Sequence, residues 1–325
     1  MQQVKYAGST NNADSTVVKV VSVDSSLTWV SPAENAVFKI TQDAELPEIV
    51  FEFRTQVAGD YKWSWIIEWE AKVSGLRERA RKGDVLQTFK ESGSFVSKAC
   101  SWTVDFSEKV LGGTLTVEVS VGAKTLKRAI VINGQNPTVE SIATYIATLD
   151  DMTGFEKLLK QETGSKHFIN FDGEPIAAFD KGYGITQMTN PAPTYEQVWN
   201  WKANILGGSS VYKDKVRFAR KYLGQSGRTY TDEQLQHEVF SRWNGGSYHE
   251  WNAASASWVR KKNILCDSNT GNIGWSMDKE KNKGQTEAEL RERDKDTYSK
   301  GTKGQSDEHP WEYKGVCYAD HVLGE

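Results

Sequence analysis

The chain has 325 residues, of which 38% are hydrophobic and 26% are charged, a composition typical of globular proteins and long enough for about two domains. Its net charge is −3 and neither half has an excess of basic residues, which argues against a nucleic-acid partner. No apolar run reaches the ~18 residues of a membrane span, and the first residues lack the apolar core of a signal peptide.

Residues 1–35 are expected to form an extended N-terminal segment. Across 36–136, apolar residues alternate with polar ones, as at Ile49, Phe51 and Phe53. This period of two, with turn-forming residues between the stretches, predicts half-buried antiparallel strands. About seven short strands in about 100 residues predict a β-sandwich of immunoglobulin or fibronectin type.

The tryptophans between residues 63 and 69 leave two roles open for this β domain. Trp63, Trp65 and Trp69 fall on one face of a predicted strand. If they fill the core, the domain is a spacer or docking module. If they are exposed, they form an aromatic face that suits carbohydrate.

Residues 137–325 are expected to form a second, mainly α domain. Apolar residues recur there at helical spacing in several segments, which predicts amphipathic helices. These segments are 139–149, 153–164, 195–208, 214–224 and 231–243. A charge-rich stretch at 276–309 predicts a solvated helix flanked by mobile loops.

One glutamate, Glu162, lies at the end of the apolar helical run 153–164, and further carboxylates follow on the next loop. Apolar neighbours partly desolvate such an acid and favour its protonated form, which can then act as a general acid. Glycoside cleavage needs that acid and often a second carboxylate across the bond. The candidates for the second role are Asp180 first, then Glu174 and Asp172.

Four segments of this region resemble the goose-type lysozymes and bacterial lytic transglycosylases of the lysozyme-like superfamily. They are Glu162-Thr163, Gly182–Met188, Asn204–Gly208 and Arg242–Tyr248, and they follow the order of the family's motifs. The similarity covers roughly 138–260 and does not reach the β domain. It implies a lysozyme-like fold for residues 137–325.

The resemblance also implies a peptidoglycan muramidase that cleaves the β-1,4 bond between N-acetylmuramic acid and N-acetylglucosamine, with Glu162 as general acid. The positions expected to bind glycan are Tyr183, Gly184, Gln187, Asn204, Asn244 and Tyr248. Asp180 matches one assisting aspartate of goose-type lysozymes, but Thr189 and Asn190 stand where the other is expected. A lytic transglycosylase leaving 1,6-anhydro ends remains an alternative, as does a wall-binding protein without activity.

No metal or organic cofactor is implied, and the expected partner is the glycan strand. A wall-directed activity without a visible signal peptide resembles the C-terminal domains of secreted antibacterial effectors, such as those of type VI secretion. Such a protein would act in the periplasm or on the wall of a target bacterium. It would also need a secretion-machine carrier and an immunity protein in the producing cell.

Cysteine, histidine and tryptophan residues of the second half raise further questions. Cys266 and Cys317 lie in the same half and could pair in an oxidising compartment, with two buried free thiols as the alternative. The five histidines have no metal-ligand spacing and are expected to have no role in the site. The expected core tryptophans are Trp199, Trp201 and Trp243.

Overall fold

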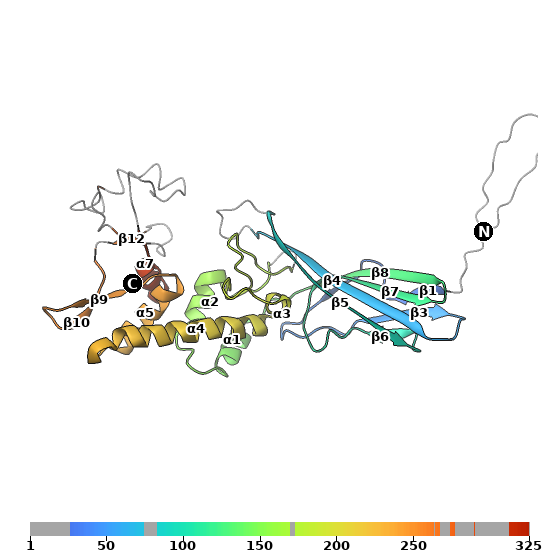
Figure 1. The fold of residues 1–325 in the computed structure, drawn as a ribbon, viewed down its shortest axis with the longest axis horizontal. Helices are drawn as coiled ribbons and strands as arrows, with labels where there is room; N and C mark the ends of the chain where they lie inside the picture. Colours follow the sequence, from blue (N-terminus) through green and yellow to red (C-terminus); the bar gives the residue numbers. More distant parts are fainter. Residues whose placement is uncertain are drawn as a thin grey trace, which may run out of the picture.

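The computed structural model describes residues 27–74, 83–169, 173–262, 264–266, 274–276, 289 and 312–324. Figure 1 shows an elongated molecule in which the strands of the first half lie at one end and most helices at the other. The stretch 276–309 falls almost wholly outside the described residues. Among those that are described, no helix has the length and hydrophobicity to span a bilayer.

Strands of the first half form two sheets. They are β1 (Leu27–Ser31), β2 (Val37–Lys39), β3 (Val50–Thr55), β4 (Tyr61–Lys72), β5 (Val85–Ser97), β6 (Ser101–Thr103), β7 (Gly113–Val121) and β8 (Lys124–Asn133). The order is β1-β3-β6 in one sheet and β2-β8-β7-β4-β5 in the other. Strands β2 and β8 are parallel, and the other neighbours are antiparallel. Strand β1 falls inside the range expected to be only an extended segment.

The apolar positions of these strands meet in one core, as their period of two predicts. Phe53 of β3 and Trp63 of β4 are each 1% exposed, and their ring centroids are 5.4 Å apart. Trp65 is half-buried and packs on Phe106 with centroids 5.1 Å apart. Trp69 is also buried, so these tryptophans contribute to the core and do not form an exposed sugar-binding face.

The second half combines helices with short strands. Its helices are α1 (Val139–Ile146), α2 (Phe155–Thr163), α3 (Tyr195–Trp199), α4 (Trp201–Leu223), α5 (Asp232–Trp243) and α7 (Val316–Leu323). Its strands are β9 (His249–Asn252), β10 (Ser257–Arg260), β11 (Ile264–Cys266), β12 (Gly274–Ser276) and β13 (Glu312–Lys314). Strands β9 and β10 pair, and β11-β12-β13 form a separate sheet.

The prediction of a β-sandwich followed by a mainly α lysozyme-like domain is wrong, because strands outweigh helices over the described residues. Two physical reasons explain the error. The strands of the β9–β10 hairpin have only four residues each, too few for an alternating pattern to stand out. The stretch 165–194 has no helical period, and its described residues, 165–169 and 173–194, form a loop with isolated bridges, such as Phe168 with Pro175.

The segments 195–208 and 214–224 are predicted as two separate helices, but the single helix α4 runs from one into the other. Glycines at 207 and 208 resemble a helix end, yet both lie inside the 23-residue helix α4. Their role is close packing, because a Cβ added to Gly208 would lie 2.5 Å from the Thr186 side chain.

The expected domain boundary at 136–137 does not separate two cores. The core of the sheets includes residues from the second half, namely Phe168, Ala177, Tyr183, Tyr195, Val198 and Trp199. The Tyr195 hydroxyl donates a 2.6 Å hydrogen bond to the Gly112 carbonyl, and a Cβ on Gly112 would lie 2.1 Å from the Trp199 ring. A second core joins α1, α2, α4, α5 and α7.

Candidate functional site

Glu162 lies in the last turn of α2, on the same face as Phe155, Leu158 and Leu159. These positions are spaced three or four residues apart, so their side chains line one side of the helix. Because that side faces the second core, the Glu162 side chain is drawn inward and is 8% exposed. The helix ends at Gly164, whose φ of 64° is a left-handed C-cap conformation.

Two aromatic side chains donate hydrogen bonds to the same oxygen of Glu162. The Tyr318 hydroxyl, on α7, is 2.5 Å from Oε1, and Trp243 Nε1, at the end of α5, is 3.3 Å from it. Tyr318 is 1% exposed. Trp243 was expected only to fill the core, and nothing in the sequence pointed to Tyr318. Together they hold one carboxyl oxygen in a fixed direction.

Thr163 connects the end of α2 to the loop at residues 182–188. Its hydroxyl donates to the Ile185 carbonyl at 3.2 Å and accepts from the Lys166 amide at 3.3 Å. Gly184, the preceding loop residue, has a φ of 68°. A Cβ there would lie 2.4 Å from the His167 ring, so the loop can approach this ring only with glycine at 184.

Asn204 of α4 holds the same loop from behind. Its Oδ1 accepts from the Thr186 amide at 3.0 Å and from the Thr186 hydroxyl at 2.8 Å. Its Nδ2 donates to the carbonyls of Tyr183 and Gln197 at 3.1 and 2.9 Å. Asn204 was predicted to bind glycan, but its side chain is fully buried and supports the loop instead.

His167 has a similar supporting role, although the histidines were expected to have none. Its Nδ1 accepts from the Ile185 amide at 3.1 Å, so the proton lies on Nε2, which donates to the Val198 carbonyl at 2.8 Å. Burial lowers the pKa of His167 to about 4, which keeps the ring neutral. An isolated histidine without a spacing pattern gave no sequence signal for this role.

Tyr183 and Gln187 flank the glycine loop in different environments. Tyr183 is 1% exposed, and its ring centroid is 5.4 Å from that of Phe89 on β5. Burial raises the pKa of Tyr183 to about 12. Its side chain therefore belongs to the shared core and is not available to a substrate. Gln187 is half-buried, and its Nε2 donates to the Gly184 carbonyl at 2.8 Å.

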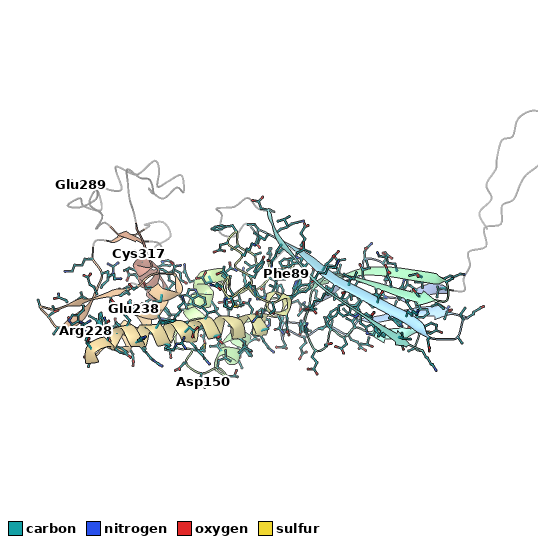
Figure 2. The ribbon with its side chains drawn as sticks, viewed as in Figure 1. Phe89, Asp150, Arg228, Glu238, Glu289 and Cys317 are labelled. Atoms are coloured by element: carbon teal, nitrogen blue, oxygen red, sulfur yellow. The ribbon has the colours of Figure 1, made fainter. Side chains whose placement is uncertain are left out.

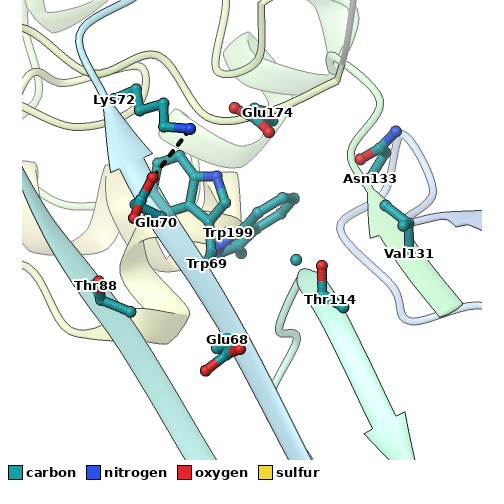
Figure 3. A pocket seen from close by; sticks show the side chains of 11 residues that line it. Glu68, Trp69, Glu70, Lys72, Thr88, Thr114, Val131, Asn133, Glu174 and Trp199 are labelled. Atoms are coloured by element: carbon teal, nitrogen blue, oxygen red, sulfur yellow. Dashed lines mark ion pairs between the residues drawn. The ribbon is translucent and has the colours of Figure 1, made fainter. Parts of the chain in front are cut away.

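The candidate second carboxylates point in other directions. Asp180 is exposed and accepts from the Gly182 amide at 3.2 Å within its own turn. Glu174 lines a pocket of about 440 Å³ against the five-stranded sheet, beside Lys72 and Trp199 (Figure 3). Asp172 lies outside the described residues. Asp180 therefore faces solvent and Glu174 faces the sheet, whereas Glu162 faces α5 and α7.

The remaining predicted residues, Asn244 and Tyr248, lie between α5 and β9. The Tyr248 hydroxyl donates to Asp320 of α7 at 2.6 Å, and its ring is 4% exposed. Tyr248 thus contacts the helix that carries Tyr318. Asn244 is the C-cap residue of α5, and its amide donates to the Phe240 carbonyl at 3.3 Å.

A buried charged cluster behind Tyr248 was not predicted. Glu238 of α5 has no exposed surface, and its Oε2 accepts from the amides of Tyr248 and His249 at 3.0 Å each. Arg242 lies 2.8 Å from the other oxygen. Burial raises the pKa of Glu238, but its bonds to His249 and its pairing with Arg242 outweigh burial and leave the pKa below its usual value. The four-residue spacing of Glu238 and Arg242 is the sequence signal for this pair.

The cysteines also differ in state. Cys317, which precedes Tyr318 on α7, is disulfide-bonded, and Cys100 is a free thiol. Figure 2 labels Cys317 and Glu238 in the helical part of the molecule. Within the described part of the chain, no cluster of three or more His, Cys, Asp or Glu residues is arranged to hold a metal ion.

Hydrogen bonds link the four segments that carry the sequence resemblance into one chain of contacts that includes Glu162. The end of α2 contacts the glycine loop through Thr163, the loop contacts α4 through Asn204, and α5 contacts Glu162 through Trp243. A scan of protein-family models finds no match, and a search of curated proteins finds no relative. A functional assignment therefore depends on the geometry of these residues.

Proposed function

We propose that this protein cleaves the β-1,4 bond between N-acetylmuramic acid and N-acetylglucosamine in peptidoglycan, with Glu162 as the general acid. The observation that carries the proposal is the Glu162 carboxyl itself, 8% exposed and held at Oε1 by Tyr318 and Trp243. Protonation of a glycosidic oxygen needs a carboxylic acid in a fixed orientation and a partly desolvated setting.

The glycine loop gives further support to a glycan substrate. Gly184 lets the backbone approach His167 and Asn204 closely, and Thr163 keeps this loop next to Glu162. Most backbone groups of this loop are hydrogen-bonded within the protein, so its contribution is to hold the chain beside Glu162 in a fixed position. The resemblance of the segments around Glu162 to goose-type lysozymes and lytic transglycosylases points to the same substrate class.

A lytic transglycosylase is the second candidate, and the directions of the two candidate carboxylates that the structure describes, Asp180 and Glu174, favour it. Hydrolysis with a second carboxylate needs the two carboxyl groups roughly 5 to 9.5 Å apart across the bond. Asp180 is bonded within its own exposed turn, and Glu174 faces the sheet pocket. In a transglycosylase the muramyl 6-hydroxyl attacks instead of water, so Glu162 acts alone, first as acid and then as base.

The proposed substrate lies outside the cytoplasm. Our proposal therefore includes action in the periplasm or on the wall of a target bacterium, as a secreted antibacterial effector with a carrier. It also includes an immunity protein that protects the producing cell. Expression of the chain in the periplasm of a test bacterium should cause lysis that depends on Glu162.

The decisive experiment is mass spectrometry of the soluble products released from purified peptidoglycan. The wild-type protein is compared with Glu162→Gln, which keeps an oxygen acceptor for Tyr318 but cannot donate the proton. A matched control is Glu156→Gln, because Glu156 is an exposed acid on the same helix. We expect Glu162→Gln to lose about 10²- to 10⁴-fold of the activity and Glu156→Gln to retain it.

The product decides between the two candidates. Reducing muropeptides support the hydrolase, and 1,6-anhydro muropeptides support the transglycosylase. Equal activity of Glu162→Gln and the wild type would contradict the role of Glu162. Cosedimentation with the wall without any product would favour a binding protein over an enzyme.

A further inference from the structure

The shorter of the two hydrogen bonds described above for Glu162 comes from a remote part of the chain. Tyr318 follows Glu162 by 156 positions and reaches it from α7, a helix of eight residues. A helix of this length is not stable by itself in water, so α7 depends on its contacts with the rest of the protein. The environment of Glu162 therefore depends on what holds α7 in place.

Close packing and an ion pair hold two points of α7. A Cβ added to Gly246, just after α5, would lie 2.1 Å from the amide nitrogen of Gly315, at the start of α7. Further along, Asp320 accepts from the Tyr248 hydroxyl at 2.6 Å and from Arg260 at 2.6 Å. The Arg260 side chain is 41% exposed, so this ion pair is partly screened by water.

The disulfide of Cys317 holds α7 at the residue next to Tyr318. Cys317 is 1% exposed and lies in the second core. The chain has three cysteines, and Cys100 is free, so Cys266 is the one remaining cysteine. A covalent link one residue away limits the directions in which the Tyr318 side chain can move.

We propose that Tyr318 is a positioning residue for Glu162 and that the Cys317 disulfide holds it there, so that glycan cleavage requires the oxidised protein. The inference rests on the function proposed above. Without the disulfide, α7 keeps its packing in the second core, the close contact at Gly315 and the partly exposed ion pair of Asp320, but it loses the covalent link that fixes the residue next to Tyr318. Misplacement of a catalytic group by about 1 Å can lower a rate by about 10²-fold.

The redox step is a thiol–disulfide exchange. A dithiol such as dithiothreitol attacks one sulfur, the S–S bond breaks, and two electrons and two protons pass to the protein. The protein then carries two thiols, and the dithiol becomes a cyclic disulfide. Oxidised glutathione drives the reverse reaction. A protein of this kind is inactive in a reducing cytosol and active in an oxidising compartment such as the periplasm.

The activity test compares oxidised and dithiothreitol-treated protein on purified peptidoglycan. We expect reduction, Cys266→Ser and Tyr318→Phe each to lower kcat at least about 10-fold, with KM little changed. Cys100→Ser is the matched control and should respond to reduction as the wild type does. Reoxidation with glutathione should restore the reduced wild type but not Cys266→Ser. Full activity of the reduced protein would overturn the proposal.

A second measurement does not depend on activity. Hydrogen exchange followed by mass spectrometry reports the protection of the amides in α7, with α4 as the internal reference. We expect faster exchange at 316–323 after reduction and unchanged exchange in α4. Unchanged exchange in α7 would refute the disulfide's role even in an active enzyme. Faster exchange in α7 of a protein that never cleaves glycan would instead refute the function proposed above.

Discussion

Replacement of Gly184 by alanine should lower the free energy of unfolding for two reasons, neither of which applies to glycine. The first is the left-handed backbone, since a non-glycine residue at a φ of 68° costs about 1–2 kcal/mol. The second is steric, since the new Cβ would lie 2.4 Å from the His167 ring and 2.7 Å from Asn204 Nδ2. Both neighbours are fully buried, so overpacking should add about 1–3 kcal/mol. The expected total loss is about 2–5 kcal/mol of unfolding free energy.

Gly164 provides the matched control for this substitution. Its φ is 64°, but a Cβ there would meet no atom within 4 Å. Gly164→Ala should therefore cost only the backbone term of about 1–2 kcal/mol. Urea unfolding followed by far-UV circular dichroism measures both variants. Equal losses at 164 and 184 would refute the argument that His167 and Asn204 enclose the loop tightly.

Three further predictions concern pH and packing. The unfolded chain protonates His167 as the pH falls through its usual pKa of 6.5, whereas the folded protein does so only near 4. The free energy of unfolding should therefore decrease by up to about 3 kcal/mol as the pH is lowered from 6.5 to 4. The variant His167→Gln should show a flatter pH dependence in urea unfolding. The pKa of Glu238 is lowered, so its stabilisation is present above its usual 4.5 and is lost as the pH falls through the folded-state value; Glu238→Gln, but not Glu156→Gln, should flatten the acid loss. Tyr195→Phe leaves the Gly112 carbonyl without its buried donor and should lower the free energy of unfolding by about 1–3 kcal/mol. Fluorescence and circular dichroism should report the same single unfolding transition, and two separate transitions would contradict the shared core.

Part of the site could be predicted because its signals are local. Glu162 follows apolar residues at helical spacing, and the structure buries it on that helix face. The glycine at 184 signals a special backbone conformation, and it has a positive φ. Tyr318 and His167 could not be found in this way, because their roles arise only when distant segments pack together.

The fold was harder to predict for a related reason. Alternation in β4 predicts which face is buried, and Trp63, Ile67 and Trp69 are buried on it. Periodicity does not indicate which element covers that face. At Trp69 the covering residues are Tyr183 and Trp199 of the second half. A linker-like sequence near 136 therefore did not mark a boundary between independent cores.

The distance in sequence between Glu162 and Tyr318 has a consequence for the order of synthesis. A ribosome produces α2, the glycine loop, α4 and α5 long before it reaches residue 318, so these elements can pack while α7 does not yet exist. During that interval, Oε1 of Glu162 lacks the hydroxyl that lies 2.5 Å away in the finished protein. A nascent chain stopped before α7 would thus contain the acid without the Tyr318 hydroxyl. For the wall-degrading activity proposed above, the catalytic acid would lack this support until α7 has been made.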